Sequence, residues 1–343
     1  MALGAAEDSV RAPSLVESET SMSLLRLAGF RAVRVTSTWE PGLSAPTEHE
    51  ASVLANVAAA AALHGVRVYV SVYHAGSRTT PLTAEARAEF ASYVAEIVKA
   101  NPTLRDVIVG NEPNLNRFWM PQFDEEGNDV AAPAYLALLI EVYDAVKRGS
   151  PDVRVWGGAL APRGIDRPNT GRDTHSPVTF IRDLGAAYRV TGRARPPLDG
   201  FAYHPYPASS SAPPDEPTNP DSSSILMADY EEKLRPELDA AFGPGLPVLY
   251  SELGVETAIP ASKRSLYEGD EPGKPVDEAT QADFYRRAIE LAACQEGVEG
   301  LLLFHSHDEP SLVGFQSGVY YVDGTPKESL EPVRDAIEST MCP

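Results

Sequence analysis

Short apolar runs alternate along the chain with longer segments whose apolar residues recur at helical spacing. The apolar runs predict eight strands: Ala2–Ala6, Phe30–Thr36, Val66–Val72, Arg105–Val109, Val153–Gly157, Leu198–Tyr203, Pro247–Ser251 and Gly300–His305. Nearly continuous apolar runs of this kind are typical of parallel strands that are covered on both faces.

Helical segments follow these runs in regular order. They are Ser14–Ala28, Glu48–His64, Thr83–Ala100, Pro133–Gly149, Ser176–Tyr188, Ser223–Phe242, Asp277–Cys294 and Lys327–Thr340. Gly65 directly after the second segment favours a helix C-cap there. Eight strand–helix units predict an α/β protein built as a single (β/α)8 TIM barrel over residues 1–343, rather than an open doubly wound sheet.

The loops after strands four to seven are long and rich in proline. Asn114–Pro133 follows the fourth strand, Pro205–Pro220 the sixth and Thr257–Pro275 the seventh. In a barrel, these loops all lie on the face where the strands end, which is where active sites occur. We therefore expect an ordered substrate groove on that face.

Composition narrows the range of partners. The formal net charge of −20 repels nucleic-acid phosphates and anionic lipid headgroups, so neither is an expected partner. No segment reaches the roughly 18 uninterrupted apolar residues of a membrane span. Cys294 and Cys342 are too few for a disulfide scaffold, and they are either thiols or a single disulfide. Because Met1 runs directly into the first apolar segment, we expect a secreted protein whose leader is missing from this sequence.

Two of the predicted strands lead into a glutamate. The fourth continues as Gly110-Asn111-Glu112-Pro113, and the seventh continues into Glu252. Taken alone, each could be a surface or helix-capping acid. Because strands four and seven lie on opposite sides of a barrel mouth, the two carboxyl groups are expected to face each other across one site. Two facing carboxyl groups are what cleavage of a glycosidic bond requires.

This pair, in register with eight units, resembles the clan A glycoside hydrolases along essentially the whole chain. Asn111-Glu112-Pro113 is similar to the clan's Asn-Glu-Pro motif, whose glutamate is the acid/base, and Glu252 is similar to its strand-seven nucleophile. The chain looks closest to cellulase-like members of family five and to family thirty-nine, of actinobacterial type. The resemblance implies a retaining glycosidase that cleaves a β-glycosidic bond in a carbohydrate substrate without a cofactor.

The resemblance also implies partners for the nucleophile. Arg34 lies where clan members often carry an arginine, and Tyr206 is similar to the tyrosine of a His-x-Tyr pattern. Both would hold Glu252 as an anion. The alternative for Arg34 is an ordinary surface arginine.

Other residues are expected to contact the sugar. Those implied by the resemblance are Asn111, which would donate to the 2-hydroxyl, and Tyr73, His74 and His204. A buried histidine with satisfied hydrogen bonds is the alternative for His204. Aromatic rings that could stack on a sugar are Trp39, Phe118 and Trp119, whereas Trp156 lies inside a strand and is expected in the core.

The end of strand eight departs from the clan, because the usual tryptophan is absent. Phe304 or His305 would take its place in the sugar site. The same stretch raises an alternative, since His305, His307, Asp308 and Glu309 could be metal ligands of a barrel hydrolase. A third possibility is a barrel that binds carbohydrate without cleaving it.

Overall fold

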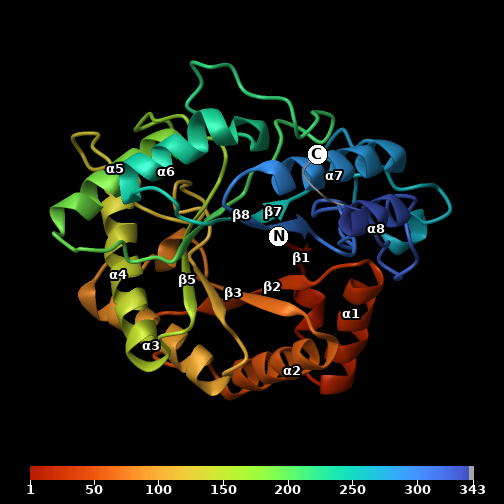
Figure 1. Ribbon diagram of the computed structural model, residues 1–343, viewed down its shortest axis with the longest axis horizontal. Helices are drawn as coiled ribbons and strands as arrows, with labels where there is room; N and C mark the ends of the chain where they lie inside the picture. The colour runs from red at the N-terminus through yellow and green to blue at the C-terminus, as the bar shows by residue number, and fades with distance from the viewer. Residues whose placement is uncertain (340–343) are drawn as a thin grey trace.

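In the computed structural model, which describes residues 1–339, the strands form a closed parallel barrel in chain order, with the last strand paired to the first. Figure 1 shows the helices as an outer ring around it. The strands are β1 (Ala2–Ala6), β2 (Ala32–Trp39), β3 (Arg67–His74), β4 (Asp106–Val109), β5 (Arg154–Leu160), β6 (Gly200–Tyr203), β7 (Val248–Leu253) and β8 (Val298–Phe304). The predicted (β/α)8 barrel is confirmed.

Each strand is followed by a helix of the outer ring. These helices are α1 (Leu15–Leu27), α2 (Glu48–His64), α3 (Ala84–Ala100), α4 (Ala131–Gly149), α5 (Pro177–Val190), α6 (Arg235–Phe242), α7 (Glu278–Cys294) and α8 (Leu330–Ser339). Short 3-10 turns cover Asp8–Val10, Ser77–Thr79, Met227–Asp229 and Arg264–Leu266, and one π-helical turn covers Tyr230–Leu234. No helix among residues 1–339 combines the length and apolar character that crossing a bilayer requires.

The sixth helical segment is shorter than predicted. The sequence pattern indicates one helix over Ser223–Phe242, but regular α-helix begins only at Arg235. Pro236 has no amide proton and therefore fits only the first turn of a helix. Upstream, the Asp229 carboxylate accepts hydrogen bonds from the amides of Leu226 (2.7 Å) and Thr218 (3.0 Å), which stabilises a loop instead.

Strands β2 and β3 run further than predicted, and this changes the environment of their last residues. Thr38 is paired with Tyr73, and Trp39 with His74, at the end of the β2–β3 ladder. Residues that the sequence pattern assigned to loops are thus part of the sheet. Trp39 and His74 are buried there.

The barrel interior is a packed core separate from the layer between strands and helices. Trp156 and Tyr69 lie in it, together with small and branched side chains from the other strands. The indole nitrogen of Trp156 donates to the Asp106 carboxylate (2.9 Å), and Gly200 leaves the space that its ring occupies. The expectation that Trp156 is a core residue is confirmed. Cys342 lies outside the described residues, so both alternatives for Cys294 and Cys342, two thiols or one disulfide, stay open.

A buried ion pair holds together the loops after β7 and β8. Lys327 Nζ lies 2.7 Å from Asp308 Oδ1, and both side chains are fully buried. The ammonium also donates to Thr257 Oγ1 (2.7 Å), and Tyr267 donates to the other Asp308 oxygen (2.7 Å). Burial raises the pKa of Asp308 and lowers that of Lys327, while their mutual attraction opposes both shifts. Asp308 is therefore a structural residue, and its interpretation as a metal ligand was wrong.

Replacing the lysine of this pair will destabilise the protein strongly. Lys327→Met leaves the Asp308 carboxylate buried without a countercharge, which costs about 3–5 kcal/mol in the free energy of unfolding. Lys263→Met is the matched control, because the Lys263–Asp323 pair is partly exposed and contributes little to the free energy of unfolding. Denaturant unfolding measures both variants, and equal losses would contradict the prediction.

Candidate active site

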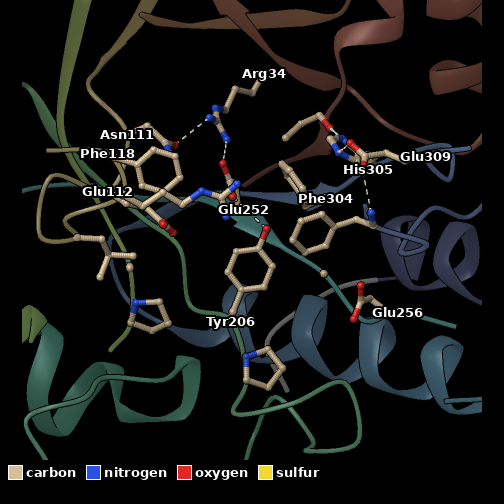
Figure 2. Close-up of a pocket in the computed structure, with 18 of the residues that line it drawn as sticks. Arg34, Asn111, Glu112, Phe118, Tyr206, Glu252, Glu256, Phe304, His305 and Glu309 are labelled. Carbon is tan, nitrogen blue, oxygen red and sulfur yellow. Dashed lines mark hydrogen bonds and ion pairs between the residues drawn. The ribbon is translucent and has the colours of Figure 1, made fainter. Parts of the chain in front are cut away.

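A cavity of about 680 Å³ opens at the face of the barrel where the strands end. Figure 2 shows its principal side chains converging on Glu252. The predicted site residues that line it are Arg34, Asn111, Glu112, Tyr206, Glu252, Phe304 and His305, with Tyr73 and Phe118 beside them. Residues on β2, β7 and β8 and residues just after β4 and β6 thus meet in one pocket, although they are far apart in the sequence.

The backbone after β4 turns sharply to present Glu112. Gly110 has φ +83°, and a Cβ there would lie 3.0 Å from the Tyr135 ring, so a side chain at this position would be strained and crowded. Glu112 itself has φ +42°, which is uncommon for a residue with a side chain. Its amide donates to the Ala159 carbonyl (2.8 Å), which ties the turn to the end of β5. Unusual backbone of this kind is concentrated at functional sites.

Glu252 is buried at the end of β7 and is held by two donors. Arg34 forms an ion pair with one carboxylate oxygen, and Tyr206 donates a hydrogen bond to the other (2.9 Å). Burial alone would raise the pKa of Glu252, but the nearby His204, the Arg34 guanidinium and the Tyr206 hydroxyl together lower it below its ordinary value. Glu252 is therefore ionised at neutral pH.

The donors to Glu252 are themselves fixed in their charge states. Burial and the neighbouring carboxylates raise the pKa of Tyr206 well above its ordinary value, so its hydroxyl keeps its proton. Arg34 also donates to Asn111 Oδ1 (3.3 Å), which orients the side-chain amide of Asn111. Arg34, Asn111 and Tyr206 thus lie around Glu252, and the contact of Asn111 to a sugar hydroxyl stays a prediction.

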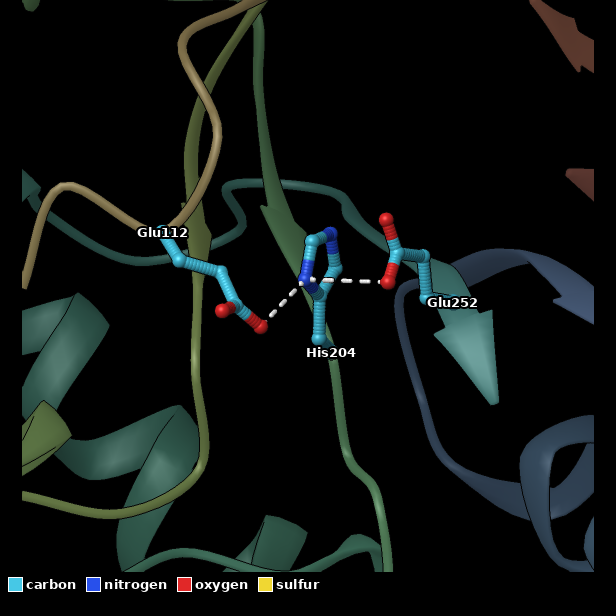
Figure 3. A group of neighbouring side chains, drawn as sticks. All are labelled: Glu112, His204 and Glu252. Carbon is cyan, nitrogen blue, oxygen red and sulfur yellow. Dashed lines mark hydrogen bonds and ion pairs between the residues drawn. The ribbon is translucent and has the colours of Figure 1, made fainter. Parts of the chain in front are cut away.

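His204 bridges the two glutamates rather than facing the cavity. Its Nδ1 lies 3.1 Å from Glu112 Oε1 and 3.6 Å from Glu252 Oε2, and its side chain is fully buried (Figure 3). The three side chains each place one polar atom within 4.8 Å of those of the other two. The expectation that His204 contacts sugar was wrong, because the ring lies beneath the carboxyl groups. It positions both of them instead.

The site geometry does not favour a metal ion. Glu112, His204 and Glu252 are the one group among residues 1–339 that brings three potential ligand atoms this close together. The Arg34 guanidinium already neutralises Glu252 and would repel a cation there.

The alternative metal site at the end of β8 does not form either. His305 Nδ1 donates to the Ala6 carbonyl (2.6 Å), whereas the His307 ring is stacked on Tyr320 and its Nδ1 lies 3.8 Å from Glu7. The two imidazoles do not converge on a common point.

Three predicted sugar contacts lie in the core. Trp39 packs on Phe90 and donates its indole N–H to the Leu43 carbonyl (2.7 Å). Trp119 is buried edge-on against His74, and His74 Nδ1 is hydrogen-bonded to the Gly76 carbonyl (2.8 Å). The interpretation of Trp39, Trp119 and His74 as sugar contacts was wrong, because neither indole nor the imidazole reaches the cavity. Their neighbours Tyr73 and Phe118 line it.

Several residues that line the cavity have no motif to reveal them. They come from the loops after β1, β4, β5, β7 and β8 and include Glu7, Arg117, Arg163, Glu256 and Phe315, whereas Glu309 was expected only as a possible metal ligand. The signal in the sequence is topological, since each follows a predicted strand and so belongs to the same face. Which loop side chains turn inward depends on contacts between the loops.

Solved structures share this barrel. A GH5_18 protein from Streptomyces cattleya, crystallised with Manβ1-4GlcNAc, is 16% identical over all of this chain and 82% of its own, with a TM-score of 0.69. A GH5_18 protein from Bifidobacterium longum subsp. infantis is 17% identical over 99% of this chain and 79% of its own, with a TM-score of 0.63. A beta-glucosidase from Exiguobacterium marinum is 14% identical, covering 98% of this chain and 97% of that one, with a TM-score of 0.61.

Sequence comparison adds no closer relative. No protein-family model matches the chain, and no curated protein matches it. At identities this low, the structural similarity establishes the fold: the chain has the (β/α)8 barrel of GH5_18 proteins and β-glycosidases.

Proposed function

We propose that this protein is a retaining glycosidase that cleaves a β-glycosidic bond, with Glu252 as nucleophile and Glu112 as acid/base. The observation that carries the proposal is the closeness of the two carboxyl groups, which place oxygens within 4.8 Å of each other in one pocket. Retaining enzymes hold their carboxyl groups about 5–5.5 Å apart, whereas inverting enzymes need about 6.5–9.5 Å to admit a water.

The environments of the two acids support different roles. Glu252 is an anion at neutral pH because Arg34 and Tyr206 hold it, and it attacks the anomeric carbon. Within the described part of the chain, Glu112 forms no ion pair with an arginine, and its side chain is partly open to the cavity. Glu112 donates its proton to the leaving oxygen, so the leaving group departs neutral and a glycosyl ester of Glu252 forms.

The second half of the reaction reverses the roles. Glu112, now a carboxylate, removes a proton from a water molecule that attacks the anomeric carbon. The ester bond breaks, Glu252 leaves as an anion, and the sugar keeps its original configuration. Asn111, oriented by Arg34, is placed to donate from its amide nitrogen to a hydroxyl of the bound sugar.

The structural neighbours support a carbohydrate substrate. Two structures of the GH5_18 protein from Streptomyces cattleya contain the sugars Manβ1-4GlcNAc and GlcNAc. Other neighbours are glucosidases and beta-glucuronidases. Because the names of these neighbours refer to different sugars, they support cleavage of a glycosidic bond but do not favour a particular sugar.

A panel of β-linked oligosaccharides and aryl β-glycosides will test the reaction. Wild-type protein is expected to release product from at least one member, and Glu252→Gln is expected to lower kcat by at least about 10³-fold, because the amide cannot form the ester. Glu290→Gln on the outer surface of α7 is the control. If Glu252→Gln cleaves as well as wild type, Glu252 is not the nucleophile.

The acid/base assignment has its own test. Glu112→Ala is expected to lose activity most on substrates with poor leaving groups, because these need the proton. Added azide should restore turnover of an aryl glycoside with a good leaving group, since it attacks the glycosyl ester without a general base. The product should be a glycosyl azide of unchanged configuration. No effect of azide, or an inverted product, would contradict the assignment.

The contact from Tyr206 predicts a pH effect. Tyr206→Phe removes a hydrogen bond that favours the ionised form of Glu252, so the pKa of Glu252 rises. The acidic limb of the kcat/KM profile should then move to higher pH, and kcat should fall by about 10–100-fold. Tyr188→Phe is the control, because the Tyr188 hydroxyl on α5 donates to the Arg193 carbonyl, away from the site. An unchanged acidic limb would show that Tyr206 does not stabilise the anion.

A further inference from the structure

The proposed mechanism divides the cavity into two sides. Glu112 must lie beside the leaving oxygen, and Glu252 must lie against the sugar that is attacked. Figure 2 shows Phe118 next to Glu112, and it shows Phe304, His305 and Glu309 on the opposite side of Glu252. If the proposed function holds, the leaving group lies on the Phe118 side and the attacked sugar lies against the loop that follows β8.

The Glu309 carboxylate lies on the sugar side and is held in place, although it forms no ion pair with a lysine or arginine among residues 1–339. Glu309 Oε2 accepts the Phe315 amide proton (2.7 Å), and Gly314 lies so close that a Cβ there would be 1.7 Å from this oxygen. Among residues 1–339, no group donates a hydrogen bond to Glu309 Oε1, and His305 Nε2 lies 3.6 Å from it. Oε1 is therefore available to a ligand, while Oε2 fixes the direction of the carboxylate.

His305 is the support for Glu309. Its Nδ1 donates to the Ala6 carbonyl (2.6 Å), and its ring lies against Phe304 with centroids 3.8 Å apart. Its buried Nε2 has no hydrogen-bond partner among residues 1–339 and points to Glu309. The His305 contact, acting against burial, lowers the pKa of Glu309, so this carboxylate is ionised.

An ionised carboxylate beside aromatic rings has a defined ligand chemistry. It only accepts hydrogen bonds, so it binds the hydroxyl groups of a sugar and repels another anion. The Phe304 and Phe315 rings, 4.9 Å apart and in edge contact, supply apolar surface next to it. We propose that Glu309, positioned by His305, determines specificity by accepting hydrogen bonds from hydroxyls of the attacked sugar, which is therefore neutral on that face.

The remaining charges along the cavity agree with this assignment. Glu7 and Glu256 also line the sugar side and add negative charge there. Arg117 and Arg163 line the cavity from the loops after β4 and β5. Arg163 donates to the Tyr206 and Pro207 carbonyls, and neither arginine forms an ion pair with a residue in 1–339. An acidic group of a substrate is accommodated beside these arginines and disfavoured beside Glu309.

Two variants test the role of Glu309. Glu309→Ala is expected to lower kcat/KM about 10–100-fold for whichever β-glycoside the wild type cleaves, as expected for loss of a hydrogen bond to a charged group. Deoxy versions of that glycoside identify the contact: removing the hydroxyl that Glu309 binds should harm wild type but make no further difference to Glu309→Ala. Glu309→Gln keeps the shape of the side chain but removes its charge. It should lower the ratio of kcat/KM for a β-glucoside to kcat/KM for a β-glucuronide by at least about tenfold.

The control is Glu268→Gln, because Glu268 is an exposed glutamate in the neighbouring loop. The activity of this variant should equal that of the wild type. If the Glu309 variants keep wild-type kcat/KM and discrimination while Glu252→Gln is inactive, the specificity role is overturned and the glycosidase proposal stands. If Glu252→Gln remains active, the proposed function itself fails. If no glycoside is turned over, calorimetry can compare the sugar affinity of Glu252→Gln protein with that of the double variant Glu252→Gln/Glu309→Ala. Equal affinities would overturn the proposed contact between Glu309 and the sugar.

Discussion

The buried ion pair between Arg34 and Glu252 is the interaction on which the site depends. Burying a carboxylate costs several kcal/mol unless a countercharge and hydrogen bonds compensate for the lost hydration. Arg34 supplies the countercharge from β2 and Tyr206 supplies a hydrogen bond from the loop after β6. Because β2 and β7 lie far apart around the sheet, only a closed barrel brings these groups together.

The same surroundings make the two glutamates chemically different. Glu252 contacts Arg34, Tyr206 and His204, so its charged form is favoured. Glu112 contacts only His204 among these and projects from a turn with unusual backbone angles. Two carboxyl groups in different environments can act as nucleophile and proton donor in one reaction. His204 lies between them and sets their separation.

The loop after β8 shows how adjacent acids acquire opposite roles. Asp308 turns inward to the buried Lys327 and joins this loop to the one after β7. Glu309, the next residue, turns to the cavity and is fixed by the Phe315 amide. The ion pair stabilises the loop, and the stable loop holds the second carboxylate at the wall of the pocket. Stability and recognition are thus built from neighbouring positions.

The apolar pattern of the chain is enough to predict the number and order of the strands and helices, because buried parallel strands require continuous apolar runs and helices require their own spacing. It also located Glu112 and Glu252, since both follow such runs directly. Which other side chains face the cavity depends on how the folded strands and loops pack together. Trp39 and His74 lie in the β2–β3 ladder and are buried, whereas Tyr73, next to His74, lines the pocket. In a strand, a shift of one residue moves a side chain to the opposite face, and the length of a strand depends on its partner rather than on its own residues.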